Sequence, residues 1–472
     1  MSSIDRRRFV AGSTAALTGL LAGAAPMPEC FQAMGTRVGD VRANSAVIWT
    51  RITRNAERLK DGVVIPGRAN GRKEIPEPTV PVDQLEGACP GAEGEVRVRY
   101  GLNADFSDTT FTPWAKVTAE GDYIHQFRIG DLQPGQLYHY GVEVRPRPGA
   151  ASVEHFGTFH TAPLAAVETP VRFCVMTCQG YPDRGHPDGH PIYPSMLALR
   201  PHFTSLTGDL VYYDNDLPVA TTVELARYHW QRMFSLPRLA QFNSHVATYW
   251  LKDDHDTLKN DTWPGTKQKL LTFTEGQEIF RQQAPMEPGK SYRTFRWGKD
   301  LQIWLSEGRD DRSPNNTADG PQKTIWGTEQ KDWFKRTVLE SNATWKVLIS
   351  PTPLVGPDRG NKNDNHSNAG FEHEGRELRE WIQNYAADNL FVICGDRHWQ
   401  YHSVHPETGL NEFSVGAASD EHAGGSPGED PKIHKFHRVK GGFLSVDVAG
   451  KSITFNHHDV AGKVVYTWTS QA

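Results

Sequence analysis

The stretch Trp250-Leu-Lys-Asp-Asp-His-Asp256 places three carboxylic acids and one histidine within four consecutive residues. It follows the apolar, β-prone run His245-Val-Ala-Thr-Tyr-Trp250, so we expect the acids to lie directly after a strand. Crowded carboxylates raise one another's pKa, and a bound cation is what neutralises such a group. The stretch therefore indicates a metal site, although solvated helix caps would also explain an isolated Asp-Asp-His.

Two further stretches end a short apolar run with an acid. Asp209 follows the run 203–208, which ends in glycine. Asp396 and His398 follow the run 389–395, which also ends in glycine. Open α/β sheets keep their sites in the loops at the carboxyl ends of strands. Three strands that each end in an acid therefore predict one metal centre built by three loops.

Length and composition exclude several classes of protein. The chain has 472 residues, and 38% of them are hydrophobic and 23% charged, as in ordinary globular proteins. This length favours two or three domains. The formal net charge of −5 at pH 7 argues against a nucleic-acid binding surface. The five cysteines are too few and too scattered for a disulfide scaffold.

The first residues resemble an export signal. Asp5-Arg-Arg-Arg-Phe-Val10 contains a twin arginine, Arg6-Arg7, and the small, moderately apolar segment 11–25 follows it. That segment is too short and too rich in glycine, alanine and threonine to span a bilayer. We expect residues 1–25 to direct export by the twin-arginine translocase to the periplasm or the medium, with no stable membrane span.

Residues 30–165 read as an all-β domain. Apolar and polar residues alternate in the segments 45–51, 94–100, 123–129 and 137–144. Short alternating strands without a helical period are typical of a fibronectin type III or immunoglobulin-like sandwich. The stretch Leu132-Gln-Pro-Gly-Gln-Leu-Tyr-His-Tyr140 also resembles the corner common in fibronectin type III modules. The Gly-, Pro- and charge-rich segment 53–90 is expected to form a surface loop.

Residues 170–472 show a different pattern. Near-continuous apolar runs at 171–177, 345–350 and 390–394 are typical of strands buried on both faces. Helical periodicity at 222–234, 328–339 and 372–387 alternates with them, and alternating strands at 442–448, 452–455 and 464–468 end the chain. The pattern predicts an α/β domain of the α+β sandwich kind, preceded by the all-β domain.

These blocks resemble a known superfamily. Gly208-Asp-Leu-Val-Tyr212, Asp253-Asp-His-Asp256 and Gly395-Asp-Arg-His398 are similar to the blocks of the calcineurin-like metallophosphatases. The departures match one branch, the alkaline phosphatase D (PhoD-like) family. Cys178 replaces the first Asp-x-His block, Asp254 stands where asparagine is usual, and Asp396 replaces the first histidine of the last block.

The resemblance implies a first metal site with soft and phenolic ligands. Asp209 would bridge two metal ions, and Cys178, Tyr212 and His398 would complete the first site. A thiolate and a phenolate suit a ferric ion better than magnesium. Tyr213 competes for the tyrosine role, and the spacing from Asp209 selects Tyr212. A small buried thiol without a metal is the alternative for Cys178.

The resemblance also implies a second, oxygen-rich site. Asp254 and Asp396 would join Asp209 there, which suits a hard cation such as calcium. Zinc or manganese are alternatives for this binuclear or larger centre. His255 would act as a catalytic residue together with Asp209, either binding the phosphoryl oxygens or protonating the leaving group. A satisfied core histidine is the alternative reading of His255.

One loop is unusual. Many relatives supply a further histidine before the last block, but the strand 346–354 has none, and the polar loop 355–368 follows it. Asp364, Asn365 and His366 could complete the second site, or Arg359 and Lys362 could bind a phosphate. A solvated loop rich in glycine and asparagine explains the same composition. We take His366, Arg359 and Asn365 as candidate substrate-binding residues.

The resemblance implies an exported, metal-dependent phosphoric ester hydrolase, an alkaline phosphatase or phosphodiesterase. A hydroxide bridging the metal ions would attack phosphorus in a small-molecule or polymer phosphate ester. One alternative is a diesterase for larger esters, such as a phospholipase D-like or teichoic-acid-type enzyme. Another is a catalytically inert cell-surface binding protein. The choice between monoesters and diesters stays open at this point.

Overall fold

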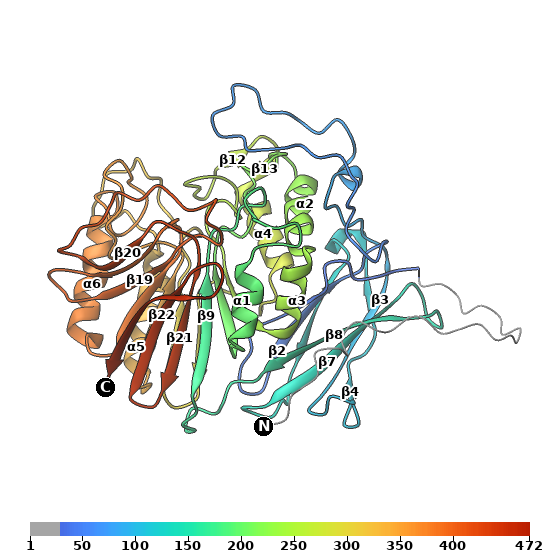
Figure 1. Ribbon diagram of the computed structural model, residues 1–472, viewed down its shortest axis with the longest axis horizontal. Helices are drawn as coiled ribbons and strands as arrows, with labels where there is room; N and C mark the ends of the chain where they lie inside the picture. Colours follow the sequence, from blue (N-terminus) through green and yellow to red (C-terminus); the bar gives the residue numbers. More distant parts are fainter. Residues whose placement is uncertain (1–28) are drawn as a thin grey trace, which may run out of the picture.

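The computed structural model describes residues 29–472, and the predicted export signal lies outside the described residues. Among the residues described, no helix is both long enough and apolar enough to cross a membrane. Two large sheets face each other, with α1 to α4 on the outer side of one and α5 and α6 on the outer side of the other (Figure 1). The six helices are α1 (Ile192–Ala198), α2 (Val223–Phe234), α3 (Pro237–His245), α4 (Phe273–Gln283), α5 (Gly327–Glu340) and α6 (Glu372–Ala386).

The first large sheet has nine strands. In spatial order they are β23 (Val464–Gln471), β22 (Ser452–His458), β21 (Phe443–Ala449), β9 (Val171–Met176), β10 (Phe203–Thr207), β11 (Ala247–Leu251), β1 (Thr36–Gly39), β2 (Ala46–Arg51) and β6 (Ile124–Ile129). Strands β9, β10 and β11 run parallel, so their carboxyl ends meet at one edge. This edge is where the sequence places Cys178, Asp209 and Asp254.

The second large sheet has seven strands. In spatial order they are β14 (Arg293–Trp297), β15 (Leu301–Leu305), β16 (Trp345–Ser350), β17 (Leu390–Cys394), β19 (Asn411–Val415), β18 (Gln400–Val404) and β20 (His434–Arg438). Strands β15, β16, β17 and β19 are mutually parallel. Asp396 and His398 follow β17, so parallel strands of both large sheets lead into candidate ligands.

Side-chain alternation along β9 shows why the sheets form a sandwich. Phe173 and Val175 lie in the core between the two sheets, whereas Cys174 and Met176 lie in the core under α1 to α4. Residues of one strand point alternately to opposite faces, so a strand apolar at every position is buried on both sides. The continuous apolar runs in the sequence thus account for a four-layer arrangement, and the predicted fold class is confirmed.

The amino-terminal β unit shares a sheet with the part of the chain that carries the candidate ligands. One of its layers is β1-β2-β6, which continues the nine-stranded sheet through the parallel pairing of Gly39 with Thr248. The other layer is a separate sheet of β4 (Thr110–Phe111), β3 (Gly94–Gly101), β7 (Leu137–Arg145) and β8 (Val153–His160), with β5 (Ala115–Val117) paired to β3. The backbone nitrogen of Gln133 donates to Tyr138 Oη at 2.9 Å, the hydrogen bond of a tyrosine corner.

The segment 53–90 is largely irregular, with one short 3₁₀ turn at Val82–Gln84. In Figure 1 it arches over α2 and the hairpin of β12 (Lys267–Gln268) and β13 (Leu271–Thr272). Leu85 and Ala88 are buried against Tyr228 of α2. The segment is therefore a loop, as expected, but one that packs on α2, outside the amino-terminal unit.

Candidate metal centre

Three of the predicted ligands have left-handed backbone conformations. Cys178, Asp209 and Asp396 have φ angles of 49°, 55° and 61°, and they follow β9, β10 and β17 respectively. Side chains other than glycine seldom adopt positive φ, and such residues concentrate at functional sites. The backbone turns sharply after each strand, so three side chains that enter from different strands converge on one place.

Two glycines let these loops touch. A Cβ atom at Gly395 would lie 2.6 Å from Thr207 Oγ1 and 2.8 Å from the carbonyl oxygen of Pro351. A Cβ atom at Gly208, whose φ is 97°, would lie 2.6 Å from the Cβ of Asp253. Both contacts are too short for any side chain. The glycine before Asp209 and the glycine before Asp396 are therefore required by close packing of the loops.

The structure brings the first group of candidate ligands together. Candidate ligand atoms of Cys178, Asp209 and His398 all lie within 4.8 Å of one another. The hydroxyl oxygen of Tyr212 lies 3.3 Å from Asp209 Oδ2 and 3.4 Å from His398 Nε2. Cys178 Sγ lies 3.5 Å from the same Asp209 oxygen. A thiol, a phenol, an imidazole and a carboxylate thus face one point.

Asp209 also belongs to two acidic groups. One contains Asp253 and Asp396, and the other contains Asp254 and His255, each with ligand atoms within 4.8 Å of one another. Oδ1 of Asp209 and Oδ2 of Asp253 are buried and have no hydrogen-bond partner among the described residues. Buried carboxylate oxygens normally have partners. Two unpartnered carboxylate oxygens, one of them on the shared Asp209, fit a hard, oxygen-seeking cation.

Both carboxylate oxygens of Asp254 accept hydrogen bonds, whereas Asp253 has one oxygen without a partner among the described residues. Its Oδ1 accepts from the backbone nitrogen of His255 at 3.0 Å, and its Oδ2 accepts from that of Asp261 at 2.7 Å. Arg309 Nε donates to Asp253 Oδ1 at 2.6 Å and leaves the other Asp253 oxygen free. The structure therefore adds Asp253 to the candidates for the second site, beside the predicted Asp254 and Asp396.

Burial makes the centre unfavourable without a cation. It raises the pKa of Asp209, Cys178 and Tyr212 well above their ordinary values. The negative charge of Asp209 raises the pKa of Cys178 and of Tyr212 further. The same burial lowers the pKa of His398, which keeps its imidazole in the neutral form that binds metals. Bound cations would stabilise the ionised forms of Asp209, Cys178 and Tyr212 and so offset the cost of burying their charges. The donor set therefore fits two metal ions sharing Asp209.

His255 is held by a carboxylate from another loop. Its Nδ1 lies 2.6 Å from Asp214 Oδ1, and the second oxygen of Asp214 accepts from the backbone nitrogen of Asn260 at 2.9 Å. Burial alone would lower the pKa of His255, but the carboxylates of Asp214, Asp254 and Asp209 outweigh it and raise that pKa well above the ordinary value. With Nδ1 occupied, Nε2 is the atom left for a substrate.

Comparison with known proteins decides the family. A family model described as "PhoD-like phosphatase" matches residues 173–441, and one described as "PhoD-like phosphatase, N-terminal domain" matches residues 23–163. The chain belongs to the PhoD-like phosphatase family. It is therefore an enzyme, a metal-dependent phosphoesterase whose substrate is a phosphate ester. The fold and the family predicted from the sequence are both confirmed.

Individual relatives agree with this assignment. Alkaline phosphatase D of Bacillus subtilis (strain 168) is 22% identical over 466 residues, which cover 84% of this chain and 72% of that protein. A solved structure described as "Structure of PhoD" superposes with a TM-score of 0.73 at 17% identity, covering 95% of this chain and 90% of that one. The purple acid phosphatase PPD1 of yellow lupin (Lupinus luteus) superposes with a TM-score of 0.65 at 14% identity, covering 92% and 74%. At these identities the two structures show the fold alone.

The loop 355–368 of this PhoD-like phosphatase is only partly directed at the centre. His366 is fully buried, and its Nε2 lies 2.9 Å from Glu374 Oε2 on α6. Asn365 is also fully buried, and its Nδ2 donates to Asp358 and Asp364. Neither side chain is placed to touch a substrate, because both are used within the fold.

Arg359 and Lys362 occupy a different position. Their side chains are 36% and 23% exposed. Arg359 contributes to the lowered pKa of His398, and Lys362 contributes to the lowered pKa of Asp254, after burial and nearer charges. The positive charge of Arg359 is therefore felt at His398, in the first ligand group, and that of Lys362 at Asp254, among the acids. Of the three candidate substrate residues predicted in this loop, Arg359 is the one whose side chain is partly exposed.

Sequence reasoning missed three residues at this centre, namely Asp253, Asp214 and His422. Asp253 stood inside the quoted acidic stretch, but the resemblance directed attention to its neighbour. Asp214 follows Tyr213 in a run of loop residues, where an acid is ordinary. His422 lies between β19 and β20, 24 residues after His398, and no local pattern marks it. A fold is needed to find the last two.

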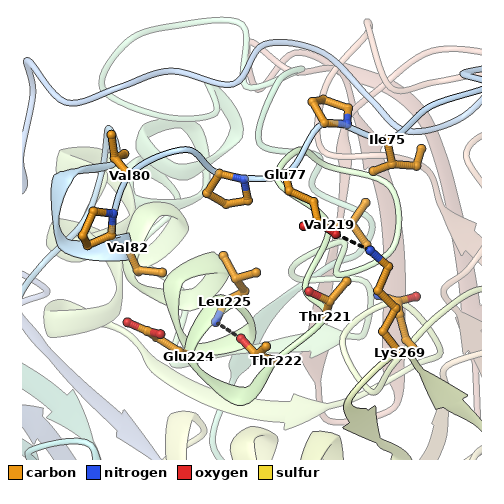
Figure 2. Close-up of a pocket in the computed structure, with 14 residues that line it drawn as sticks. Ile75, Glu77, Val80, Val82, Val219, Thr221, Thr222, Glu224, Leu225 and Lys269 are labelled. Atoms are coloured by element: carbon orange, nitrogen blue, oxygen red, sulfur yellow. Dashed lines mark hydrogen bonds and ion pairs between the residues drawn. The ribbon is translucent and has the colours of Figure 1, made fainter.

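A separate cavity lies away from the ligands. It has a volume of about 420 Å³ and is lined by residues 75–78 and 80–82 of the long loop, by residues 219, 221, 222, 224 and 225 at the start of α2, and by residues 268 and 269. Figure 2 shows Glu77 and Lys269 joined across it at 2.5 Å. None of the candidate metal ligands lines this cavity. It therefore is not the catalytic pocket.

Proposed function

We propose that this chain is an exported phosphatase or phosphodiesterase in which two metal ions share Asp209. The observation that carries the proposal is the dual position of that side chain. It faces a thiol, a phenol and an imidazole in one direction and further acids in the other. A single carboxylate between two different donor sets is what a mixed binuclear site needs.

The two donor sets support different metals. Cys178, Tyr212 and His398 with Asp209 suit a ferric ion, because thiolate and phenolate are strong, negatively charged donors. Asp209 and Asp396, with Asp253 and Asp254 beside them, offer oxygen donors and suit calcium. Zinc or manganese would fit the same side chains with less selectivity. The proposed centre therefore contains iron with calcium.

When bound, the two cations supply an acidified water as nucleophile and neutralise charge on the phosphoryl group. The protein's own residues do the rest. Asp209 would fix the spacing between the two sites, since it belongs to all three ligand groups and one of its oxygens, Oδ2, lies beside Cys178 and Tyr212. Arg309 holds Asp253 in place by a 2.6 Å hydrogen bond, so the acidic side of the centre is preorganised. No covalent intermediate on the protein is required.

His255 serves the leaving group or the phosphoryl oxygens. Its ring is held by Asp214 through Nδ1, which leaves Nε2 free. An imidazole in this orientation donates a hydrogen bond to a substrate oxygen as charge develops there. Arg359, partly exposed and close enough to His398 to affect its pKa, is placed to attract a phosphate group. Substrates of either monoester or diester type are compatible with these contacts.

Export is a separate part of the proposal. The twin arginine Arg6-Arg7 supports transport by the twin-arginine translocase to the periplasm or the medium. Its test is fractionation of cells that produce the protein with Arg6→Lys and Arg7→Lys together. The proposal expects the altered protein to stay in the cytoplasm, and unchanged export would contradict it.

The catalytic proposal is tested with aryl phosphate monoesters and diesters. We expect the metal-loaded wild type to hydrolyse at least one of them and Asp209→Asn to lose activity by about 10³-fold or more, because several kcal/mol of charge stabilisation depend on both cations. Asp447→Asn is the matched control, since Asp447 of β21 pairs with Arg172 of β9, outside the ligand groups. No hydrolysis by the wild type, or full activity of Asp209→Asn, would contradict the proposal.

A further inference from the structure

His422 lies in direct contact with two of the predicted ligands. Its Nε2 is 2.8 Å from the hydroxyl oxygen of Tyr212, and its ring centroid is 4.4 Å from that of His398. The side chain comes from the segment between β19 and β20 and is almost fully buried, with 6% of the residue exposed. None of the ligand groups found among the described residues contains His422. It therefore adjoins the first metal site without belonging to its ligand set.

The other ring nitrogen of His422 is held by a charged pair. Nη2 of Arg68 lies 2.8 Å from His422 Nδ1, and Asp183 Oδ2 also lies 2.8 Å from that nitrogen. Arg68 and Asp183 are themselves in contact as an ion pair. The guanidinium can only donate and the ionised carboxylate can only accept, and together they hold the ring of His422 at Nδ1 in one orientation. In that orientation Nε2 faces the hydroxyl oxygen of Tyr212.

Arg68 belongs to the long loop of the amino-terminal unit. The backbone nitrogen of Ala69 donates to the carbonyl oxygen of Asn215 at 2.7 Å, and that of Leu217 donates to Gly67 at 3.3 Å. Arg68 and Asp216 thus form an isolated antiparallel bridge four residues after Tyr212. This docking fixes the arginine beside the ligand although some 144 residues separate the two in sequence.

We propose that His422 is a positioning residue for Tyr212, and that Arg68 and Asp183 hold the ring of His422 in place for that role. The inference rests on the proposed function, in which Tyr212 is a metal ligand. An N–H donated to the phenolate oxygen fixes its direction and stabilises its negative charge, as outer hydrogen bonds do for other metal ligands. The amino-terminal loop is then a working part of the metal centre.

The test compares His422→Phe with His422→Gln. Phenylalanine keeps a ring to pack against His398 but has no donor, whereas the glutamine amide restores an N–H near the position of Nε2. The readouts are metal content after graded chelator treatment, measured by plasma mass spectrometry, and the visible absorption of the metal-loaded protein. We expect His422→Phe to hold its first-site metal roughly 10–100-fold less tightly and His422→Gln to recover most of that loss.

Absorption identifies the ligand through which His422 acts. A tyrosinate charge-transfer band that is absent in Tyr212→Phe is expected to shift in His422→Phe with metal still bound. Arg68→Met should change metal retention in the same direction by a smaller factor, and it leaves the buried histidine in place if His422→Phe does not fold. Arg54→Gln, at an exposed arginine of the same loop, is the matched control and should behave as wild type.

The outcomes separate the inference from the function on which it rests. Wild-type protein that binds no metal and hydrolyses no ester contradicts the proposed function. Wild-type protein that binds metal, together with His422→Phe or Arg68→Met of unchanged metal retention and unchanged absorption, overturns the inference alone. Equal loss in His422→Phe and His422→Gln would also overturn it, because the side chain would then matter for packing rather than for its N–H.

Discussion

His255 is one residue whose role depends on a partner from another loop. Asp214 holds its Nδ1 at 2.6 Å, and Asn260 holds Asp214 in turn. The candidate ligand atoms of Asp209 and Asp254 lie within 4.8 Å of this histidine, so its position alone would also allow it to bind a metal. Substitution separates the two roles, because a ligand and a proton donor fail in different ways.

We predict that His255→Ala lowers kcat by roughly 10²–10⁴-fold with metal content unchanged, because it removes a proton donor and not a ligand. Asp214→Asn should cost less, about tenfold, since the amide oxygen still accepts from Nδ1 but carries no charge. Steady-state kinetics and elemental analysis of the two variants check this. Metal loss in His255→Ala would contradict the assigned role.

Glu374 and His366 form a second pair, and the sequence analysis predicted His366 alone as a substrate-binding residue. The carboxylate accepts from His366 and from the backbone nitrogen of Ile325, at 2.9 and 2.5 Å. Burial alone would raise the pKa of Glu374, but these hydrogen bonds and the histidine charge outweigh it and lower the pKa from 4.5 to about 2. The ionised form therefore stabilises the fold.

This pair predicts a pH dependence of stability. The folded pKa is depressed, so its contribution of about 3 kcal/mol is present above about pH 4.5 and is lost as the pH falls towards 2. Glu374→Gln should therefore be less stable than wild type at pH 6, and the gap should narrow as the pH falls. Denaturant unfolding at several pH values measures it.

Glu372→Gln is the matched control for that series. Glu372 lies on the same helix, is half exposed and pairs with Arg379 at 2.9 Å. Arg379 is buried but keeps its hydrogen bonds to the carbonyl oxygens of Leu354 and His366, and the carboxylate of Glu372 is half in solvent, so this variant should stay within about 1 kcal/mol of wild type. A gap between wild type and Glu374→Gln that does not change with pH would refute the linkage.

Residues could be predicted where chemistry and strand pattern coincide. Cys178, Asp209, Asp396 and His398 each follow a strand that the sequence marks as buried, and the structure brings them to one edge of the sandwich. His422 and Arg68 have no such signal, because their positions depend on how distant loops dock. The buried position of His366 was hidden for a related reason. A loop can be rich in polar residues because they form hydrogen bonds within the protein, and composition does not distinguish this from substrate binding.

At the scale of elements, α4 shows how a helix supports the site. Thr272 and Glu275 form a capping box at its start, and Gly276 packs directly on the loop that carries Asp253 and Asp254. A Cβ atom at Gly276 would lie 1.7 Å from the carbonyl oxygen of Thr257. The helix can therefore approach the ligand loop only because a glycine stands at the contact.

Gly276→Ala is predicted to destabilise the protein although alanine favours helices. Helix propensity would gain about 1 kcal/mol, whereas overpacking against a rigid backbone costs more, so we expect a net loss of about 1–3 kcal/mol and weaker metal binding. Thr274→Ala, exposed on the same helix, is the control and should be neutral or slightly stabilising. Thermal unfolding and metal content measure both variants. Equal behaviour of the two would contradict the packing argument.

Elements with a clear period were predictable, and short polar ones were not. The helices predicted at 222–234, 328–339 and 372–387 match α2, α5 and α6 closely. Strand β20, His434-Lys-Phe-His-Arg438, has only one apolar residue and was missed. It forms because β18 offers an unpaired edge, as the antiparallel pairing of the two strands shows. Pairing with a distant strand therefore makes this segment a β-strand, and its local sequence does not predict one.

At the scale of the whole molecule, the amino-terminal unit is joined to the catalytic part by more than a linker. Strand β1 pairs with β11, and the buried guanidinium of Arg37 donates to the carbonyl oxygen of Gln283 at 2.6 Å while it covers Trp49 and Trp250. The loop 53–90 adds Arg68 at the metal centre. Two segments that read as separate domains in sequence thus build one site.

The central claim is that one carboxylate is shared by two different metal ions. Its most direct test is elemental analysis by plasma mass spectrometry of natively exported wild type, Asp209→Asn and Cys178→Ala. We predict near-stoichiometric iron together with calcium in the wild type, loss of both metals in Asp209→Asn and loss of iron with calcium retained in Cys178→Ala. Wild-type protein without metal, or metal content indifferent to both substitutions, would contradict it.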